Sequence, residues 1–148
     1  LDWYIGWFLD INFSRYSKIN EYINNSDDYI GSIGNSFYYY NGYLVIEIYA
    51  LTSLCDDFEN IVISTANGIS DDDRELFELV KKNSLTSLSV RKDSISNYVR
   101  PIEDNYITFD YAEVDDIDVI KNFSYDDYKK VINSIDFSYY SVFYRKKK

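Results

Sequence analysis

The 148-residue sequence contains no histidine and a single cysteine, Cys55. Histidine is the usual general base and metal ligand near neutral pH, so its absence excludes Ser-His-Asp triads, Cys-His dyads and histidine-bound zinc or haem. One cysteine excludes an internal disulfide framework, and we therefore expect a reducing, cytoplasmic location. No apolar run reaches the roughly 18 residues of a membrane span, and we expect no membrane partner and no secretion signal.

Proline and glycine are also scarce, with one and five residues, while large side chains and carboxylates are abundant. The chain is 46% hydrophobic and includes 17 Tyr, 9 Phe and 2 Trp. This content is too rich in large side chains for intrinsic disorder, despite a net charge of −10. The length fits one core, so we expect a single domain over residues 1–148.

Most of the expected elements are strands. The clearest is a hairpin, because Asn41-Gly42 tolerates the positive φ angles of a type I′ turn between two apolar runs. Its strands are expected at residues 37–40 and 43–51, and further strands at 3–13, 60–65, 85–91, 95–99, 105–114 and 137–144.

Serines signal the helices. Ser17 precedes a short apolar stripe at residues 18–25, and Ser70 precedes three aspartates and the stripe Leu76, Phe77 and Val80. Ser124 opens the last helix, with Asp127 to close a capping box, Phe123 to pack on Tyr128, and Val131, Ile132 and Ile135 facing inward. This order predicts an α+β fold, a mainly antiparallel β-sheet with two or three helices packed on it.

Negative charge is concentrated in two stretches. Seven carboxylates face one arginine in residues 56–75, and nine face one lysine in residues 103–127. Such a surface repels phosphate backbones, so we expect no direct binding to nucleic acid; it attracts a basic protein instead. The candidate contact residues are Asp56, Asp57, Glu59, Asp71, Asp72, Asp73, Asp115, Asp116 and Asp118. Taken singly, these carboxylates also fit helix first turns or a solvated face.

Tyrosine offers a large contact area with few rotatable bonds, and it is enriched at protein interfaces. Tyr38, Tyr39 and Tyr40 lie beside the hairpin turn, where neighbouring side chains alternate between the faces of a strand. At least one of these rings is therefore expected to be exposed and available to a partner. The alternative is that they pack the second face of the sheet.

No motif specifies a reaction, and we expect no enzyme activity, no cofactor and no metal site. The aspartate runs lack the glycine and distal glutamate of an EF-hand. Cys55 is flanked by Asp56 and Asp57, which disfavour a thiolate, so a buried structural thiol is expected. A pair of carboxylates with stacking aromatics would suffice for carbohydrate binding or hydrolysis, which stays an alternative.

A small, acidic, tyrosine-rich α+β chain without a catalytic set resembles the immunity proteins of bacterial toxin systems, including contact-dependent growth inhibition. The residues behind the resemblance are Asp56-Asp57, Asp71-Asp72-Asp73, Asp115-Asp116 and Tyr38-Tyr39-Tyr40. It implies a cytoplasmic, non-enzymatic protein that neutralises one cognate basic toxin domain, such as a nuclease, by blocking its active site or a neighbouring surface. The other alternative is a viral or bacterial adaptor that binds a protein whose surface need not be basic.

Overall fold

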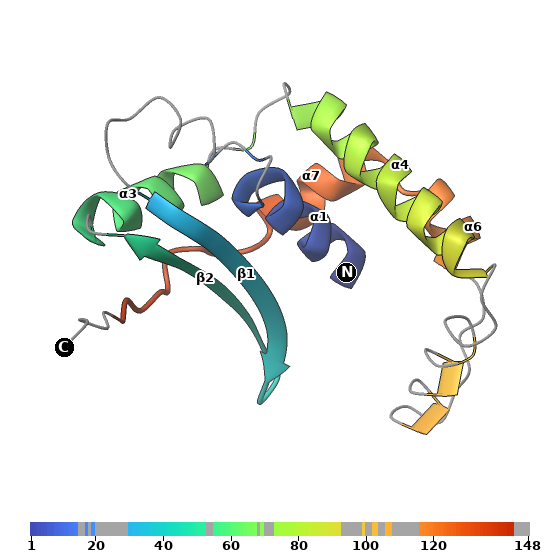
Figure 1. Ribbon diagram of the computed structural model, residues 1–148, viewed down its shortest axis with the longest axis horizontal. Coiled ribbons are helices and arrows are strands. Elements are labelled where there is room, and N and C mark those ends of the chain that lie inside the picture. The colour runs from blue at the N-terminus through green and yellow to red at the C-terminus, as the bar shows by residue number, and fades with distance from the viewer. Residues whose placement is uncertain are drawn as a thin grey trace.

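The computed structural model describes residues 1–14, 17, 19, 30–52, 55–67, 69, 73–92, 99, 102–103, 106–107 and 116–143. For residues 30–32, 55, 56, 92 and 116 it describes the backbone only. The elements are α1 (Asp2–Phe13), β1 (Ile30–Tyr40), β2 (Tyr43–Thr52), α3 (Cys55–Ala66), α4 (Asp73–Lys92), α6 (Asp116–Lys121) and α7 (Tyr125–Asn133). The α+β class is confirmed, with α1 between the hairpin and the helices α4 and α7 (Figure 1).

Helix α1 corrects the strand expected at residues 3–13. A continuous apolar run fits a buried helix as well as a buried strand, and its length of 12 residues favours the helix. The least apolar positions, Asp2, Gly6 and Asp10, recur every four residues and mark one narrow side. The other sides are buried, so α1 is the central helix of the core.

An aromatic cluster joins α1 to the other helices. The ring of Trp7 meets that of Phe77 edge to face, with centroids 5.4 Å apart, and the Trp7 indole donates a 2.8 Å hydrogen bond to Ser84 of α4. Tyr4 packs on Phe123 at 4.6 Å, and Phe77 packs on Tyr128 of α7 at 5.2 Å. Edge and offset ring contacts of this kind add to the free energy gained from burial.

The hairpin is confirmed, with β1 and β2 paired antiparallel over nearly their whole length. Asn41 has φ 48° and Gly42 has φ 81°, which are the positive angles that a type I′ turn needs. Cross-strand pairs run from Tyr40↔Tyr43 at the turn to Ile30↔Thr52 at the base, with an irregularity between Ile30 and Ile33. In the described part of the chain, this two-stranded ribbon is the whole sheet.

Helix α3 replaces the strand expected at residues 60–65. Ile61, Val62 and Ile63 have high strand propensity, but Phe58, Ile61, Val62 and Ala66 follow the helical spacing and are buried or half-buried. The spacing of apolar residues three and four positions apart therefore outweighs the strand propensity of the individual residues. Asn67 ends the helix in a turn, where its side chain donates to the carbonyl oxygen of Ile63 at 2.9 Å.

Helix α4 confirms the helix expected behind Ser70, although residues 70–72 lie outside the described part. Phe77 is fully buried, and Leu76 and Val80 pack against the core as expected. The helix continues through residues 85–91, where a strand was expected and wrong. Ser84, Leu85 and Leu88 keep facing the body at helical spacing, so nothing stops the helix after Lys82.

Helix α7 is confirmed with its cap: the Asp127 backbone N–H donates to the Ser124 side chain at 3.1 Å. Ile132 is fully buried, and Val131 and Ile135 pack against the core. Phe123 contacts Tyr4 and Trp7, and its packing on Tyr128 stays a prediction. The strand expected at residues 137–144 is wrong over 137–143, which form no ladder.

The remaining expectations fall mostly outside the described residues. These are the helix at 18–25 and the strands at 95–99 and 105–114. Within the two expected strands, Val99, Tyr106 and Ile107 are described and are helical; Ile19, in the expected helix, is helical as well. Among the described residues, no helix combines the length and the apolar character needed to cross a membrane.

The outer face of the hairpin as a candidate binding surface

The register of the hairpin sorts its side chains onto two faces. Ile33, Phe37, Leu44, Ile46, Ile48 and Ala50 pack against the core and form the inner face. The alternate positions form what we call the outer face: Gly34, Ser36, Tyr38, Tyr40, Tyr43, Val45, Glu47, Tyr49 and Leu51. One face of the ribbon therefore stabilises the fold, and the other is left to solvent.

Two hydrogen bonds hold the inner face of β1 on α1. Asn35 Nδ2 donates to the Phe13 carbonyl at 3.0 Å, and the Tyr39 hydroxyl donates to the Asp2 carboxylate at 2.8 Å. These contacts lie at the two ends of α1, so the strand is fixed along the helix. A two-stranded ribbon is marginal alone, and this support lets it project from the body (Figure 1).

The tyrosines of the outer face are exposed. Tyr43 is 75% exposed, Tyr40 is 64% exposed and Tyr49 is 60% exposed. The Tyr49 ring lies across Gly34 of β1, where an added Cβ would collide with it. Exposed aromatics gathered on one face are a feature of interaction sites in soluble proteins.

Glu47 lies in the middle of this face, where it receives two hydrogen bonds. The Ser36 hydroxyl donates to Oε2 and the Tyr38 hydroxyl donates to Oε1, each at 3.1 Å. The contact with Glu47 raises the pKa of Tyr38 above its usual value, because the neutral hydroxyl is the donor. The carboxylate is thus oriented by its neighbours on β1.

The three expected tyrosines divide between the faces. Tyr38 and Tyr40 belong to the outer face, whereas Tyr39, which is 50% exposed, donates a hydrogen bond to Asp2 of α1. Burial and the hydrogen bond to Asp2 raise the pKa of Tyr39 to about 12. Tyr39 therefore joins the hairpin to the body.

The expected acidic residues are not brought together. Asp56, Asp57 and Glu59 are on α3, Asp73 begins α4, and Asp116 and Asp118 are on α6, which lies at the other end of the molecule from α3 (Figure 1). Asp57 is exposed, while Tyr140 forms a hydrogen bond with Glu59 that raises the pKa of Tyr140. Asp71, Asp72 and Asp115 lie outside the described residues, as do the side chains of Asp56 and Asp116.

Asp73 is only 1% exposed, so it is not part of a contact surface. It lies near the buried Tyr128 hydroxyl, whose pKa is raised by burial first and then by Asp73 and Tyr125. Helix starts often carry aspartate at the surface, but this aspartate is buried. The burial of Asp73 could not be predicted from the sequence of the acidic run.

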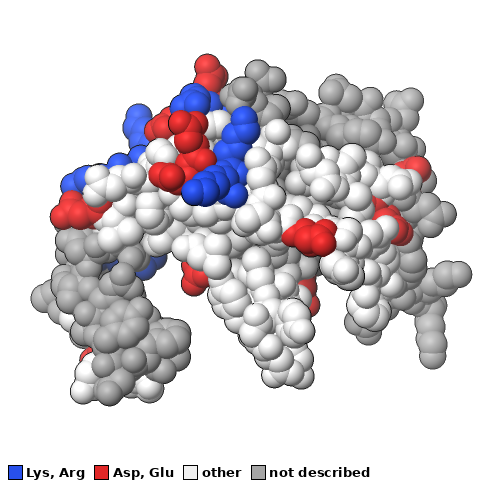
Figure 2. Space-filling model, turned by 180° about the vertical axis from the view of Figure 1, so that it is seen from behind, with Lys and Arg blue, Asp and Glu red and all other residues white. Residues whose placement is uncertain are grey.

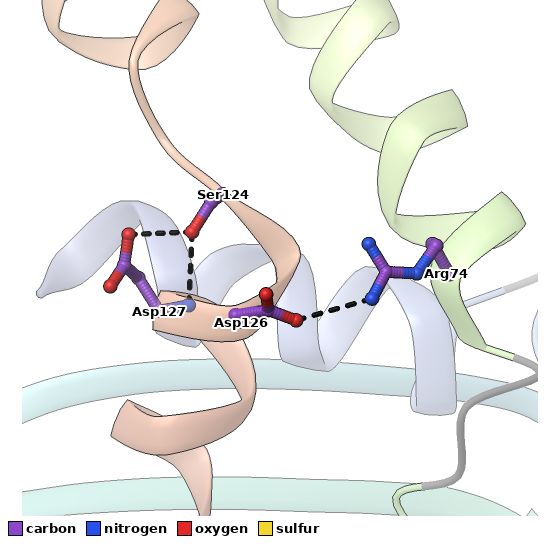
Figure 3. A network of polar contacts seen from close by, with 4 residues as sticks. All are labelled: Arg74, Ser124, Asp126 and Asp127. Carbon is purple, nitrogen blue, oxygen red and sulfur yellow. Dashed lines mark hydrogen bonds and ion pairs between the residues drawn. The ribbon is translucent and has the colours of Figure 1, made fainter.

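Other charged side chains connect helices. Arg74 Nη2 pairs with Asp126 at 3.1 Å (Figure 3). The Arg74 guanidinium also lies 4.8 Å from the centre of the Tyr125 ring. Lys81 Nζ donates to the carbonyls of Lys121 and Phe123, at 3.0 and 2.6 Å. Figure 2 shows charged side chains gathered over part of the helical body, whereas the projecting hairpin is almost uncharged.

Three outer-face residues were missed at the sequence level: Tyr43, Glu47 and Tyr49. The signal was present, because Glu47 is the one charged residue in residues 30–52. Counting outward from the Asn41-Gly42 turn also places Tyr38, Tyr40, Tyr43, Glu47 and Tyr49 on the same face. Among the described residues, no group of three or more metal-ligating side chains is found.

Comparisons with known proteins give little more. No family model matches the chain. A search of curated proteins finds similarity to the phycobiliprotein ApcE of Aglaothamnion neglectum, 29% identical over 135 residues. The match covers 88% of this chain but only 15% of that protein.

Proposed function

We propose that this chain is a non-enzymatic protein-binding domain whose binding element is the outer face of the hairpin. The observation that carries the proposal is the separation of the two faces. The inner face is committed to the core, and the outer face presents exposed tyrosines on a supported ribbon. Tyrosine is among the residues that dominate the binding energy of protein interfaces.

The hairpin is suited to enter a concave surface. Its turn carries Tyr40 and Tyr43 as a cross-strand pair, and Asn41-Gly42 makes the connection as short as two residues. The ribbon is held on α1 before any partner arrives, so little conformational entropy is lost on binding. Such a projection would occupy the cleft of a partner enzyme.

The narrower proposal is an immunity protein that neutralises a cognate basic toxin domain, such as a nuclease, in the cytoplasm. A net charge of −10 supports it, because the field of the chain accelerates association with a basic protein. Asp57 and Glu59 on α3 and Asp118 on α6 form no single patch, which supports a role for these charges in long-range attraction. The contact itself is assigned to the hairpin.

An adaptor domain of a longer protein is the second candidate. The similarity to phycobiliprotein ApcE favours it, because the match covers most of this chain and a small part of that protein. Both candidates bind a protein, and they differ in the consequence of binding. The inhibitor abolishes the activity of its partner, whereas the adaptor leaves that activity unchanged.

Photocrosslinking from two positions tests the proposal. A photoreactive amino acid replaces Tyr43 on the outer face or, as the control, Val90 on α4, which is 63% exposed. In lysate of the source organism, we expect one protein to crosslink from position 43 and to be competed by unmodified chain. The same products from both positions, or none from position 43, would refute the hairpin as the binding element.

The crosslinked partner is then purified and its affinity measured. Replacing Tyr40 and Tyr43 together by Ala is expected to weaken binding at least tenfold, as the loss of central aromatic residues does at other interfaces. An activity assay of the partner with and without the chain separates inhibitor from adaptor. Unchanged affinity would assign the contact to another surface.

A further inference from the structure

Glu47 is the one charge of the hairpin, and among the described residues no Lys or Arg pairs with it. Its recorded contacts are the hydroxyls of Ser36 and Tyr38. In contrast, Asp126 pairs with Arg74 and Asp118 pairs with Lys121 at 2.9 Å. Glu47 is thus an oriented carboxylate without a cation, on a face of neutral aromatic side chains.

The geometry of Glu47 leaves acceptor sites open. Each carboxylate oxygen accepts one hydrogen bond, from Ser36 or from Tyr38, and a carboxylate has about four lone-pair sites in all. Both oxygens are therefore able to accept a second donor from the solvent side. The planar fork of an arginine guanidinium supplies two parallel donors to two carboxylate oxygens.

The tyrosines around Glu47 add a second attraction. A guanidinium is stabilised over an aromatic face, and Tyr38 is joined to Glu47 by its hydroxyl. The chain already contains the same combination elsewhere: Arg74 pairs with the Asp126 carboxylate (Figure 3) and lies over the Tyr125 ring. At the hairpin, the tyrosine and the carboxylate are present and the arginine is missing.

We propose that Glu47, with Ser36 and Tyr38, forms a site for an arginine side chain of the partner protein, which binds across the outer face. This inference rests on the proposed function and specifies its partner as an arginine-bearing protein surface. Arginine is preferred over lysine, because an ammonium group is a point charge without the fork. The negative net charge of the chain favours the same partner.

The test uses the full chain labelled with ¹⁵N and a capped peptide of alternating glycine and arginine, with the lysine peptide as its counterpart. Near physiological ionic strength, long-range attraction is largely screened. We expect the largest amide shifts at Ser36, Tyr38 and Glu47, and tighter binding of the arginine peptide. The Glu47→Gln variant removes the charge, keeps an oxygen acceptor for one of the two hydroxyls, and is expected to bind about fivefold more weakly.

Asp57→Asn is the matched control, since it removes the same charge from an exposed side chain on α3. It is expected to change the affinity by less than about twofold. Equal weakening in both variants, equal affinity for the lysine peptide, or shifts centred away from the hairpin would overturn the arginine site. Crosslinking from position 43 does not depend on Glu47, so it separates failure of this site from failure of the proposed function.

Discussion

The helical body and the hairpin use the same residue type in opposite ways. In the body, Tyr125 and Tyr128 are buried between α4 and α7, within ring contacts of 5.2 to 5.8 Å. On the hairpin, Tyr40 and Tyr43 face solvent. A high tyrosine content therefore has two causes in one chain: filling the core and presenting a surface.

Whether a tyrosine is buried or exposed depends on how many other elements pack around its own element. The body encloses its tyrosines because α1 is apolar on nearly every side and other elements pack around it. The hairpin has one face on that body, and its other face is left uncovered. Substitutions that treat both regions alike should therefore give very different results.

The largest difference is expected between Tyr128→Ala and Tyr43→Ala. Tyr128 is fully buried, and truncating a buried aromatic residue costs about 3–5 kcal/mol of the free energy of unfolding. Tyr43 has one cross-strand neighbour, and its loss is expected to cost less than about 1 kcal/mol. Urea unfolding followed by circular dichroism measures both, and similar costs would contradict the comparison.

Two glycines give the next contrast. Gly42→Ala places a side chain at φ 81°, and we expect a loss of about 1–2 kcal/mol from the hairpin. Gly6→Ala meets no atom within 4 Å in α1, and the body is expected to gain about 0.5–1 kcal/mol. Thermal unfolding measures the expected loss of stability in Gly42→Ala and the expected gain in Gly6→Ala. A gain of stability in Gly42→Ala would disprove the type I′ turn.

Alkaline pH tests the junction between hairpin and body at Tyr39. Its pKa is raised to about 12, whereas a tyrosine in an unfolded chain has a pKa of about 10. Between about pH 10 and pH 12 the unfolded state binds fewer protons, so stability falls as the pH rises. Tyr39→Phe cannot lose this proton, and a shallower decline is expected in urea unfolding across that range. If the free energy of unfolding of Tyr39→Phe declines with pH as steeply as that of the wild type, Tyr39 does not stabilise the junction.

The smallest effect is expected within the body, for Arg74→Ala. The Asp126 ion pair is exposed and contributes a few tenths to about 1 kcal/mol, with a similar contribution from the Tyr125 ring. Lys82→Ala on the exposed side of α4 is the control, and it is expected to leave unfolding unchanged. Added salt should reduce the difference between the two variants.

The sequence was sufficient to predict the local structure where a motif is compatible with one backbone conformation. Asn41-Gly42 fixed the hairpin, and Ser124 with Asp127 fixed the start of α7. It was insufficient for residues 3–13, where an apolar run serves a helix or a strand equally, and for residues 60–65, where β-branched residues conceal helical spacing. The α+β class survived these errors, although the sheet has two strands in the described part.

The candidate surface was predicted in part. Tyr38 and Tyr40 were found by alternation, but Tyr39 was not separated from them, because its direction depends on a register set by the turn. Asp73 was expected at a surface and is enclosed by tertiary packing that no local pattern reveals. Acidic runs in a sequence thus indicate total charge better than they locate a contact.

The attachment of β1 to α1 has a mechanical consequence. Asn35 and Tyr39 bind opposite ends of the helix, so a load on the turn at Asn41 is carried along the strand and into α1. The hairpin would act as a lever whose two attachments are these hydrogen bonds to α1. Force applied at the tip is therefore transmitted to the buried helix of the core.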